Sequence, residues 1–459
     1  MERVALYNLG CKVNAYELDV MKKMLENRGY EIVPFDGIAD IYIVNTCTVT
    51  NMADRKSRQM LHRARKRNPQ AVVVAVGCYV QAGDESRLEE CIDLAIGNNK
   101  KRELIPILET FLRKRKEGGA DQTLGHTTIP DLRRPVAYEE MTAEGTAGHT
   151  RAFLKIQDGC DQFCSYCVIP FARGRVRSRD PQNVCKEARA LAQAGYQEIV
   201  LTGIHLSSYG MDLVREAGPT GKSREEIRRE TYEQAYLLRL IRNLHEIPGL
   251  KRIRLGSLEP RIISESFVRG LRELPKVCPH FHLSLQSGCD TTLKRMNRHY
   301  LAGEYYEKVS LLREVYEDPA ITTDVIVGFP GETEEEFART LAFLEKVGFY
   351  EMHVFPYSIR QGTAAACMPD QVPGRIKEER SSILLKLAKE QSRCYRERLI
   401  GRDKEILFEE SVIIEGKTYM TGHTREYVRT AFFTGENLSN RLVQGKITGF
   451  LQENMVLMQ

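Results

Sequence analysis

Short apolar runs alternate with amphipathic stretches over most of the chain, and this alternation predicts an α/β protein. In the first hundred residues three apolar runs end in turns that carry Cys11, Cys47 and Cys78, and helical periodicity separates them at 16–28 and 54–67. This order of three strands and two helices implies a parallel sheet. We therefore expect the three cysteines to emerge together at its carboxyl edge, where such sheets bind ligands.

Six strand–helix units fill the middle of the chain. The expected strands lie at 153–156, 198–202, 252–255, 282–285, 323–327 and 351–355, and the expected helices at 184–194, 228–244, 264–273, 302–316 and 334–347. Six such units predict a partial TIM-like barrel whose site lies at the carboxyl ends of the strands.

Beyond residue 401 the helical period gives way to six short apolar runs punctuated by glycine, at 404–408, 412–415, 419–423, 427–432, 441–447 and 450–457. Such a pattern fits a small OB-like β-barrel. In it, Tyr419, His423 and Tyr427 could offer stacking surfaces for bases.

Length and composition indicate a soluble globular protein of several domains, with 459 residues of which 42% are hydrophobic and 28% charged. We expect an N-terminal domain at 1–116, a linker at 117–145, a central domain at 146–375, and a helix with the small barrel at 376–459. No apolar run is long enough to cross a bilayer, and the first residues lack the features of a signal peptide, so we expect a cytoplasmic protein without a membrane partner.

The twelve cysteines therefore favour metal or redox chemistry over disulfides. A net charge of +5 is too small to argue for nucleic acid by itself.

Cys160, Cys164 and Cys167 lie just after the first strand of the central domain. Three thiolates in the spacing Cys-x3-Cys-x2-Cys can each bind one iron of a 4Fe-4S cluster and leave the fourth iron open for chemistry. A structural zinc site and three incidental core cysteines are the alternatives. Zinc normally needs four protein ligands in paired spacings, and no second pair follows here.

Cys11, Cys47 and Cys78 permit the same interpretation. A single cysteine after a strand is most often a small buried hydrophobic residue. Three cysteines at the same point of three strands are hard to explain in that way, so we interpret them as ligands of a second 4Fe-4S cluster, again with one open iron. Cys91 lies outside the pattern and is expected in the core.

The spacing of Cys160, Cys164 and Cys167 resembles the signature of radical S-adenosylmethionine (SAM) enzymes. In that superfamily SAM binds the open iron, and the reduced cluster cleaves it to a 5′-deoxyadenosyl radical. The stretches at 9–14, 45–51 and 77–81 resemble the N-terminal domain of methylthiotransferases, which insert a methylthio group at an unactivated C–H position. The resemblance covers nearly the whole chain and implies an open six-unit barrel followed by an RNA-binding TRAM domain.

This resemblance implies a tRNA methylthiotransferase that uses two 4Fe-4S clusters, SAM and an electron donor such as flavodoxin or ferredoxin. One SAM would give the radical that activates carbon 2 of an adenine, the cluster on Cys11, Cys47 and Cys78 would deliver sulfur, and a second SAM would supply the methyl group. The stretches 10–14 and 46–51 are similar to the branch that acts on N6-threonylcarbamoyladenosine at tRNA position 37.

Other functions stay open at this point. The alternatives within the family are isopentenyladenosine and ribosomal protein S12 as substrates. Outside it, the alternative is a non-catalytic iron–sulfur protein that binds RNA or transfers electrons. Ferredoxin-like carriers use four cysteines per cluster, which favours the enzyme.

Polar residues at or near the ends of the central strands are candidates for contacts with SAM, namely Gly203, Glu259, Gln286 and Asp324. Glycine permits close backbone approach to a ligand, and carboxylates and amides can bind ribose hydroxyls or an amino group. Each of the four could equally be an ordinary loop residue.

The predicted helix around 55–67 carries seven Lys or Arg residues and no acid. Its Lys56, Arg58 and Arg63 could contact tRNA phosphates in a salt-dependent way, or they could form a solvated face.

The run 173–179, just past the Cys167 loop, contains four arginines that would share one face if the chain were extended. Arg173 and Arg179 could then contact substrate phosphates or the SAM carboxylate. An exposed loop with solvated charges is the alternative.

Overall fold

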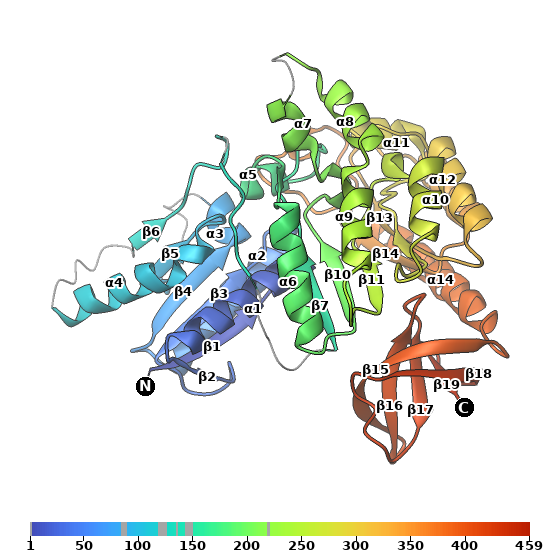
Figure 1. Ribbon diagram of the computed structural model, residues 1–459. Coiled ribbons are helices and arrows are strands. Elements are labelled where there is room, and N and C mark those ends of the chain that lie inside the picture. Colours follow the sequence, from blue (N-terminus) through green and yellow to red (C-terminus); the bar gives the residue numbers. More distant parts are fainter. Residues whose placement is uncertain (1, 84–89, 118–125, 135, 143–149, 218–220) are drawn as a thin grey trace.

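The computed structural model describes residues 2–83, 90–117, 126–134, 136–142, 150–217 and 221–459 (Figure 1). The described chain forms an N-terminal sheet domain, a central open barrel and a C-terminal closed barrel, so the predicted fold class is confirmed. No helix in these ranges is long and apolar enough to span a membrane.

The N-terminal domain contains a six-stranded parallel sheet in the order β2-β1-β3-β4-β5-β6. Its strands are β1 (Arg3–Asn8), β2 (Glu31–Val33), β3 (Ile41–Thr46), β4 (Val72–Gly77), β5 (Leu94–Ile96) and β6 (His126–Thr128). Its helices are α1 (Lys12–Asn27), α2 (Asn51–Arg67), α3 (Cys78–Ala82), η2 (Lys101–Glu103) and α4 (Leu104–Lys116). β3 and β4 are buried along their whole length, as expected of strands covered on both faces. β6 lies within the stretch expected as a linker and extends this sheet.

Six parallel strands form the central barrel, as two sheets in the orders β11-β10-β7 and β12-β13-β14. The strands are β7 (Arg151–Lys155), β10 (Glu198–Thr202), β11 (Arg252–Leu255), β12 (His280–His282), β13 (Ala320–Val327) and β14 (Glu351–Pro356). Parallel bridges from Ile253 to Val277 and from Leu258 to Leu283 join the two sheets into one arc. The expected barrel of six strand–helix units is therefore present.

Helices cover the outside of this arc, and the short strands β8 (Gln157–Asp158) and β9 (Arg177–Ser178) pair with each other. The helices and helical turns of the whole central domain are α5 (Ile169–Arg173), α6 (Pro181–Gln193), η3 (Leu206–Ser208), α7 (Met211–Ala217), α8 (Arg224–Glu233), α9 (Tyr236–His245), η4 (Pro260–Ile262), α10 (Glu265–Arg272), α11 (Asp290–Arg295), α12 (Ala302–Val315), α13 (Glu334–Val347) and η5 (Ala364–Cys367). The prediction of a single helix at 228–244 is wrong, because the structure has two helices there. The segment is divided into α8 and α9 at Ala235, whose φ of 50° is left-handed and cannot continue a helix.

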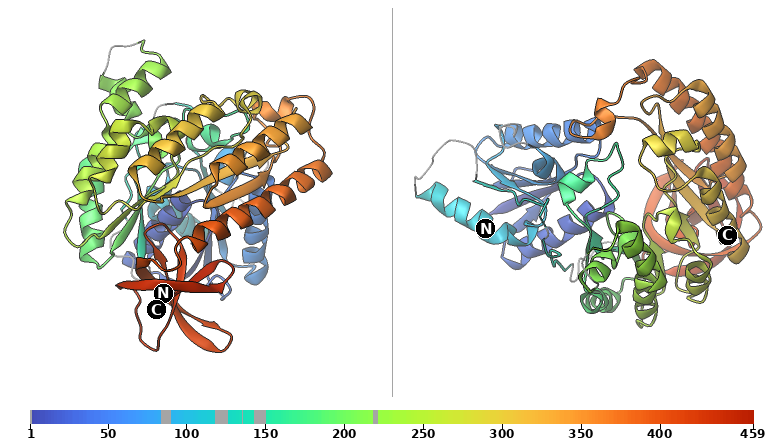
Figure 2. Two further views of the ribbon diagram at one scale, coloured as in Figure 1. Left: turned by 90° about the vertical axis from the view of Figure 1, so that its right-hand side faces the viewer. Right: turned by 90° about the horizontal axis from the view of Figure 1, so that it is seen from above.

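The open side of the arc lies beside the N-terminal domain (Figure 2). The edge strand β7 packs against α1 of the N-terminal domain, and α5 packs against α3. Because α3 follows the carboxyl end of β4 and α5 comes after the carboxyl ends of β7 and β8, this contact brings strand ends of the two domains next to each other.

α14 (Gly374–Glu397) leads into a closed five-stranded barrel in the order β15-β16-β17-β19-β18. The strands are β15 (Asp403–Ile414), β16 (Lys417–Thr424), β17 (Arg429–Phe433), β18 (Leu442–Gln452) and β19 (Met455–Met458). The first two expected strands are one strand, β15, which carries a bulge between Phe408 and Glu410.

The C-terminal barrel packs against the amino ends of the central strands. Arg254 Nη1 donates to the carbonyl oxygen of Arg425 at 2.9 Å, and Arg252 Nη2 donates to that of Glu405 at 2.7 Å. Tyr427 lies under the guanidinium of Arg254 and stacks on His423 with ring centroids 4.5 Å apart. Tyr427 and His423 are thus occupied by protein contacts, which disfavours the expected stacking on bases.

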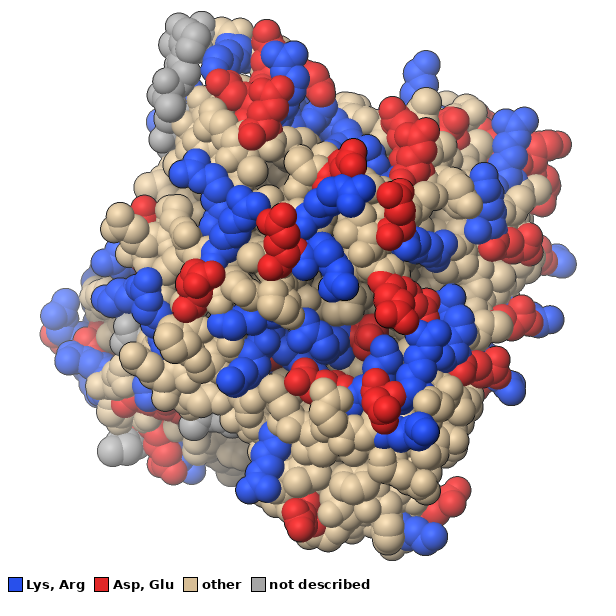
Figure 3. All heavy atoms as spheres, turned by 45° about the vertical axis from the view of Figure 1, so that its right-hand side comes forward, with Lys and Arg blue, Asp and Glu red and all other residues tan. Residues whose placement is uncertain are grey.

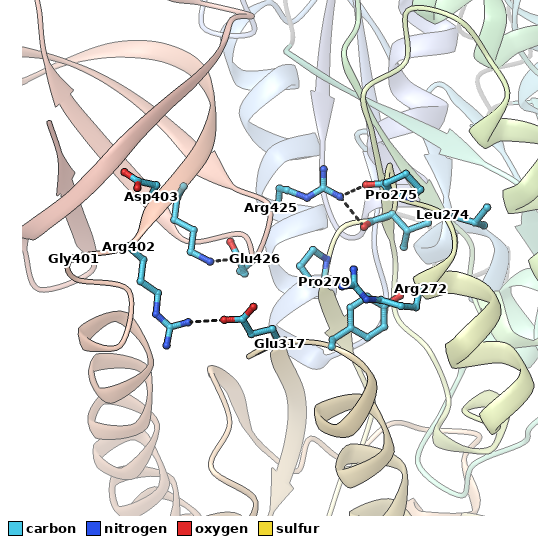
Figure 4. A pocket seen from close by; sticks show the side chains of 13 residues that line it. Arg272, Leu274, Pro275, Pro279, Glu317, Gly401, Arg402, Asp403, Arg425 and Glu426 are labelled. Carbon is cyan, nitrogen blue, oxygen red and sulfur yellow. Dashed lines mark hydrogen bonds and ion pairs between the residues drawn. The ribbon is translucent and has the colours of Figure 1, made fainter.

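A cavity of about 740 Å³ lies at this junction (Figure 4). Arg425 closes one side of it by donating to the carbonyl oxygens of Pro275 and Val277. Arg402 faces Glu317 on another side at 3.8 Å. The cavity is at the amino ends of the strands, opposite to the cysteines, so it belongs to the domain contact and not to the candidate active site.

Candidate active site

Cys11, Cys47 and Cys78 meet at the carboxyl edge of the N-terminal sheet. Cys11 caps the start of α1, Cys47 follows β3, and Cys78 begins α3 directly after β4. Gly10 and Gly77, with φ of 102° and 101°, turn the chain into two of these positions. A Cβ on Gly10 would lie 2.9 Å from Cys47 Sγ, so glycine is required for this approach.

The sulfurs of this first triad are within electrostatic reach of one another. Burial raises the pKa of Cys47 to about 11, and the neighbouring Cys78 and Cys11 add to the shift. Desolvation also raises the pKa of Cys11, although this residue is exposed on one side. Because a thiol must lose its proton to bind iron, three converging free thiols are a donor set that fits a 4Fe-4S cluster with one open iron.

Cys160, Cys164 and Cys167 form the second triad, on the loop between β8 and α5. Gly159 starts this loop with a φ of 70°, and a Cβ there would overlap the carbonyl oxygen of Arg175. Burial raises the pKa of Cys160, and it raises that of Cys167 to about 12, with Cys164 adding to both shifts. This donor set fits a second cluster of the same kind.

Arg173, the last residue of α5, reaches from the loop of the second triad to the first triad. Its Nε donates to Cys78 Sγ at 3.3 Å, and its Nη2 donates to Asn14 Oδ1 at 2.6 Å. Its Nη1 donates to Glu17 at 2.7 Å and to Asp158 at 3.2 Å. The side chain is fully buried, with 0% of its surface exposed. Arg173 therefore joins the central domain to the N-terminal domain beside the first triad.

Arg298 occupies a similar position at the second triad. Its Nη1 donates to Cys164 Sγ at 3.2 Å, and its Nε donates to the Tyr300 hydroxyl at 3.0 Å. Burial lowers the pKa of Arg298, but Tyr300 and Cys164 outweigh burial and hold this pKa well above its ordinary value. Nothing in the sequence pattern distinguished Arg298, because its meaning depends on the fold of the Cys164 loop.

The arginines at 173–179 do not share one face, because the segment is not extended throughout. Arg173 ends a helix, and Arg179 is also buried, with 1% of its surface exposed. Arg179 donates to Glu140 Oε1 at 2.7 Å and also pairs with Glu187. Contacts of Arg173 and Arg179 with substrate phosphates stay a prediction, which this burial between carboxylates disfavours.

The basic helix α2 has its apolar side, including Met60, packed under the sheet domain and its charged side outward. Lys56 is exposed, Arg58 is half-buried, and Arg63 pairs with Asp36 at 2.5 Å. Binding of tRNA phosphates by these three residues stays a prediction.

Three of the four expected SAM contacts follow strands: Gly203 comes directly after β10, Glu259 lies four residues after β11, and Gln286 lies four residues after β12. Gly203 approaches Gln157, since a Cβ on it would lie 2.9 Å from Gln157 Oε1. Glu259 is buried and accepts from Arg261 at 2.6 Å, while its Oε2 has no hydrogen-bond partner in the described chain. Gln286 is buried and has a left-handed φ of 72°. Their contacts with SAM stay predictions.

Asp324 lies in the middle of β13 and belongs to a group that the sequence analysis did not identify. Its Oδ2 is 3.2 Å from His282 Nε2, and the ring of His353 stacks on that of His282 with centroids 6.0 Å apart. Neighbours of Asp324 such as Val325 pack against the outer helices, so Asp324 faces the inside of the barrel. The alternation of β12, β13 and β14 could have revealed this polar patch.

Two family models match the chain. One is described as "Uncharacterized protein family UPF0004" and matches residues 3–97, and the other is the Radical SAM superfamily, which matches residues 154–344. These ranges contain the first and the second cysteine triad, respectively.

Among solved structures, the radical SAM methyltransferase TsrM from Kitasatospora setae aligns with a TM-score of 0.51 and 17% identity over 80% of this chain and 77% of its own. The cobalamin-dependent SAM radical enzyme OxsB aligns with a TM-score of 0.51 and 12% identity over 94% and 64%. At these identities the likeness concerns the fold alone.

Curated relatives are much more similar. The threonylcarbamoyladenosine tRNA methylthiotransferase MtaB of Bacillus subtilis is 37% identical over 97% of this chain and 94% of its own, and that of Aquifex aeolicus is 38% identical over 90% and 94%. A tRNA-2-methylthio-N(6)-dimethylallyladenosine synthase of Thermoanaerobacter sp. is 33% identical over 96% and 88%. Together with the two cysteine triads, these matches show that the chain belongs to the radical SAM methylthiotransferase family.

Proposed function

We propose that this protein is a tRNA methylthiotransferase that inserts a methylthio group at carbon 2 of N6-threonylcarbamoyladenosine at tRNA position 37. The observation that carries this proposal is that each of the two domains carries a three-cysteine site, and that Arg173, six residues after Cys167 of one site, donates to Cys78 of the other. The threonylcarbamoyl substrate is supported by the names of relatives that are 33–38% identical and cover at least 90% of the chain.

Cys160, Cys164 and Cys167 would hold the cluster that binds SAM, and Cys11, Cys47 and Cys78 would hold the second cluster. These groups supply the electron that cleaves SAM and the sulfur that is transferred, and a second SAM supplies the methyl group. The chain's own part is to hold both triads at neighbouring strand ends and to bury the residues between them. The substrate adenine would bind between the two triads.

The proposal includes an electron donor such as flavodoxin or ferredoxin, and a cytoplasmic enzyme, since tRNA is the substrate. The outer face of the central helices and the C-terminal barrel carries Lys and Arg interspersed with Asp and Glu, without one large basic patch (Figure 3). The exposed Lys56 lies on α2 of the N-terminal domain, the helix that comes after β3 and Cys47, and is a candidate phosphate contact.

The same reaction on dimethylallyladenosine is the second candidate, because relatives named for it are 32–33% identical over nearly the whole chain. Mass spectrometry of tRNA nucleosides from cells with and without the gene separates the two. We expect loss of 2-methylthio-N6-threonylcarbamoyladenosine and accumulation of its precursor without the methylthio group.

Loss of the dimethylallyl product instead would overturn the substrate and keep the reaction. No change in either nucleoside would direct the search to ribosomal protein S12. A second experiment measures SAM cleavage by purified, reconstituted and reduced protein. Failure to cleave SAM would refute the proposal that the protein is an enzyme and would favour a non-catalytic iron–sulfur protein.

A further inference from the structure

Each cysteine triad has a guanidinium on one of its sulfurs, fully buried at Arg173 and half-buried at Arg298. Arg173 Nε lies 3.3 Å from Cys78 Sγ, and Arg298 Nη1 lies 3.2 Å from Cys164 Sγ. Both distances are within the range of hydrogen bonds to sulfur. A charged donor on a ligand sulfur changes the electronic properties of an iron–sulfur cluster, because it stabilises added negative charge.

Arg173 is held in place by acids from both domains. Glu17 of α1 and Asp158 of β8 accept from its Nη1, and Lys155 binds both carboxylates, at 2.7 Å and 2.6 Å. Lys101 pairs with Glu17 from a third direction. With Arg177, which lies 3.6 Å from Asp158, four cations thus face two carboxylates. The network keeps a net positive charge, and its Arg173 contacts Cys78.

A second donor supports the same sulfur. Asn98 Nδ2 donates to Cys78 Sγ at 3.4 Å and to the carbonyl oxygen of Ala172 at 2.7 Å, so it is fixed to the residue before Arg173. Asn98 is buried, with 1% of its surface exposed. The Cys78 sulfur therefore accepts from Asn98 of the N-terminal domain and from Arg173 of the central domain.

Arg298 is fixed by a separate set of contacts. Its Nε donates to the Tyr300 hydroxyl, which itself donates to the carbonyl oxygens of Ser284 and Leu285 at 2.6 Å and 2.9 Å. These residues follow β12 in the central barrel. Arg173 and Arg298 thus belong to different networks, and each contacts one triad.

We propose that Arg173 and Arg298 are positioning residues that raise the reduction potentials of the two clusters independently, Arg173 acting on the cluster of the N-terminal domain and Arg298 on the cluster of the central barrel. The inference rests on the two-cluster assignment of the proposed function. It gives the protein a means to set the order in which one electron donor reduces the two clusters.

A merely structural role for Arg173, as a bridge between domains, is the alternative. Arg179 is the matched control, because it lies in the same segment, is equally buried and pairs with Glu140 and Glu187, but its described contacts do not include a cysteine. If the role is structural, replacing either arginine should disturb the domain contact. If Arg173 acts on the cluster, only the replacement of Arg173 should change the reduction potential.

The test is potentiometric titration of full-length, reconstituted protein, followed by electron paramagnetic resonance. Replacing Cys160, Cys164 and Cys167 with alanine leaves the N-terminal cluster to be measured alone, and replacing the first triad leaves the other. In these backgrounds we expect Arg173→Met to reduce the equilibrium constant for one-electron reduction of the N-terminal cluster at least tenfold, which is about 59 mV. Arg298→Met should have the same effect on the other cluster.

Arg173→Lys, which keeps the charge but not the planar fork, should give a smaller shift in the same direction, as should Asn98→Ala. These two variants keep the test decisive if Arg173→Met does not assemble its cluster. Unchanged potentials in Arg173→Lys and Asn98→Ala with full iron loading would overturn the inference, as would an equal shift in Arg179→Met. If the variants show the expected shifts in reduction potential but the wild-type protein makes no methylthio nucleoside, the proposed function alone is refuted.

Discussion

The replacement Gly10→Ala should specifically disable the first cysteine triad. Gly10 precedes Cys11 and has a φ of 102°, and an added Cβ would lie 2.9 Å from both Cβ and Sγ of Cys47. The backbone strain costs about 1–3 kcal/mol. Overlap in a packed site adds about 1–3 kcal/mol unless Cys47 moves, and a displaced Cys47 no longer offers its sulfur with the other two.

Gly29 is a matched control, because its φ of 90° is similar but a Cβ there would meet nothing within 4 Å. Gly29→Ala should therefore show the backbone cost alone. Iron analysis of reconstituted protein should show a loss of about half the iron in Gly10→Ala and full loading in Gly29→Ala, and urea unfolding should give the two stability costs. Full iron loading of Gly10→Ala would refute the argument that the close approach of Gly10 to Cys47 shapes the site.

Three further predictions follow from buried and exposed charges. Burial would raise the pKa of Glu17, but Arg173, Lys101 and Lys155 hold it well below its ordinary value. The stability that this carboxylate contributes is therefore present above about pH 4.3 and lost as the pH falls below it. Glu17→Gln should cost about 3–5 kcal/mol at pH 7 and approach the wild type in acid, as measured by urea unfolding. Replacing Lys56, Arg58 and Arg63 with alanine should weaken tRNA binding and reduce the slope of log K against log salt by about 0.9 for each phosphate that is no longer neutralised, whereas an unchanged slope would indicate a solvated face. Arg254→Met should leave Glu198 without the guanidinium that binds it at 2.8 Å, loosen the C-terminal barrel and increase its cleavage in limited proteolysis.

The architecture was predictable because its signals are local. Alternating apolar runs and helical periods identified the parallel sheet, the six units of the central barrel and the C-terminal barrel. The errors arose where tertiary contacts override the local pattern. Alanine ordinarily favours a helix, so the left-handed conformation of Ala235 between α8 and α9 could not be predicted from the residue type. β6 was missed because its three residues form a strand only by pairing with β5.

The cysteines were predictable for a similar reason, since strand order alone places the residues that follow parallel strands at one edge. The arginines at 173–179 were not. Their spacing left two interpretations open, namely contacts with substrate or SAM and an exposed loop with solvated charges. The partners that decide the positions of Arg173 and Arg179 are Glu17, Asp158 and Glu187, of which Glu17 lies in another domain and Asp158 is 15 residues from Arg173. A run of charged residues in a sequence does not show whether the charges are solvated by water, bound to RNA phosphates or paired with buried carboxylates.

Burial of so many charges at one contact connects the fold to the chemistry. Removing a guanidinium from water is costly, and pairing with carboxylates repays that cost only in a well-fixed geometry. The Arg173 network has this geometry because Glu17 comes from α1, which begins at Cys11, and Asp158 precedes Cys160 by two residues. Any shift of one domain against the other would separate these charges. The network therefore favours one relative placement of the two triads, which is what a reaction that combines a radical from one site with sulfur from the other requires.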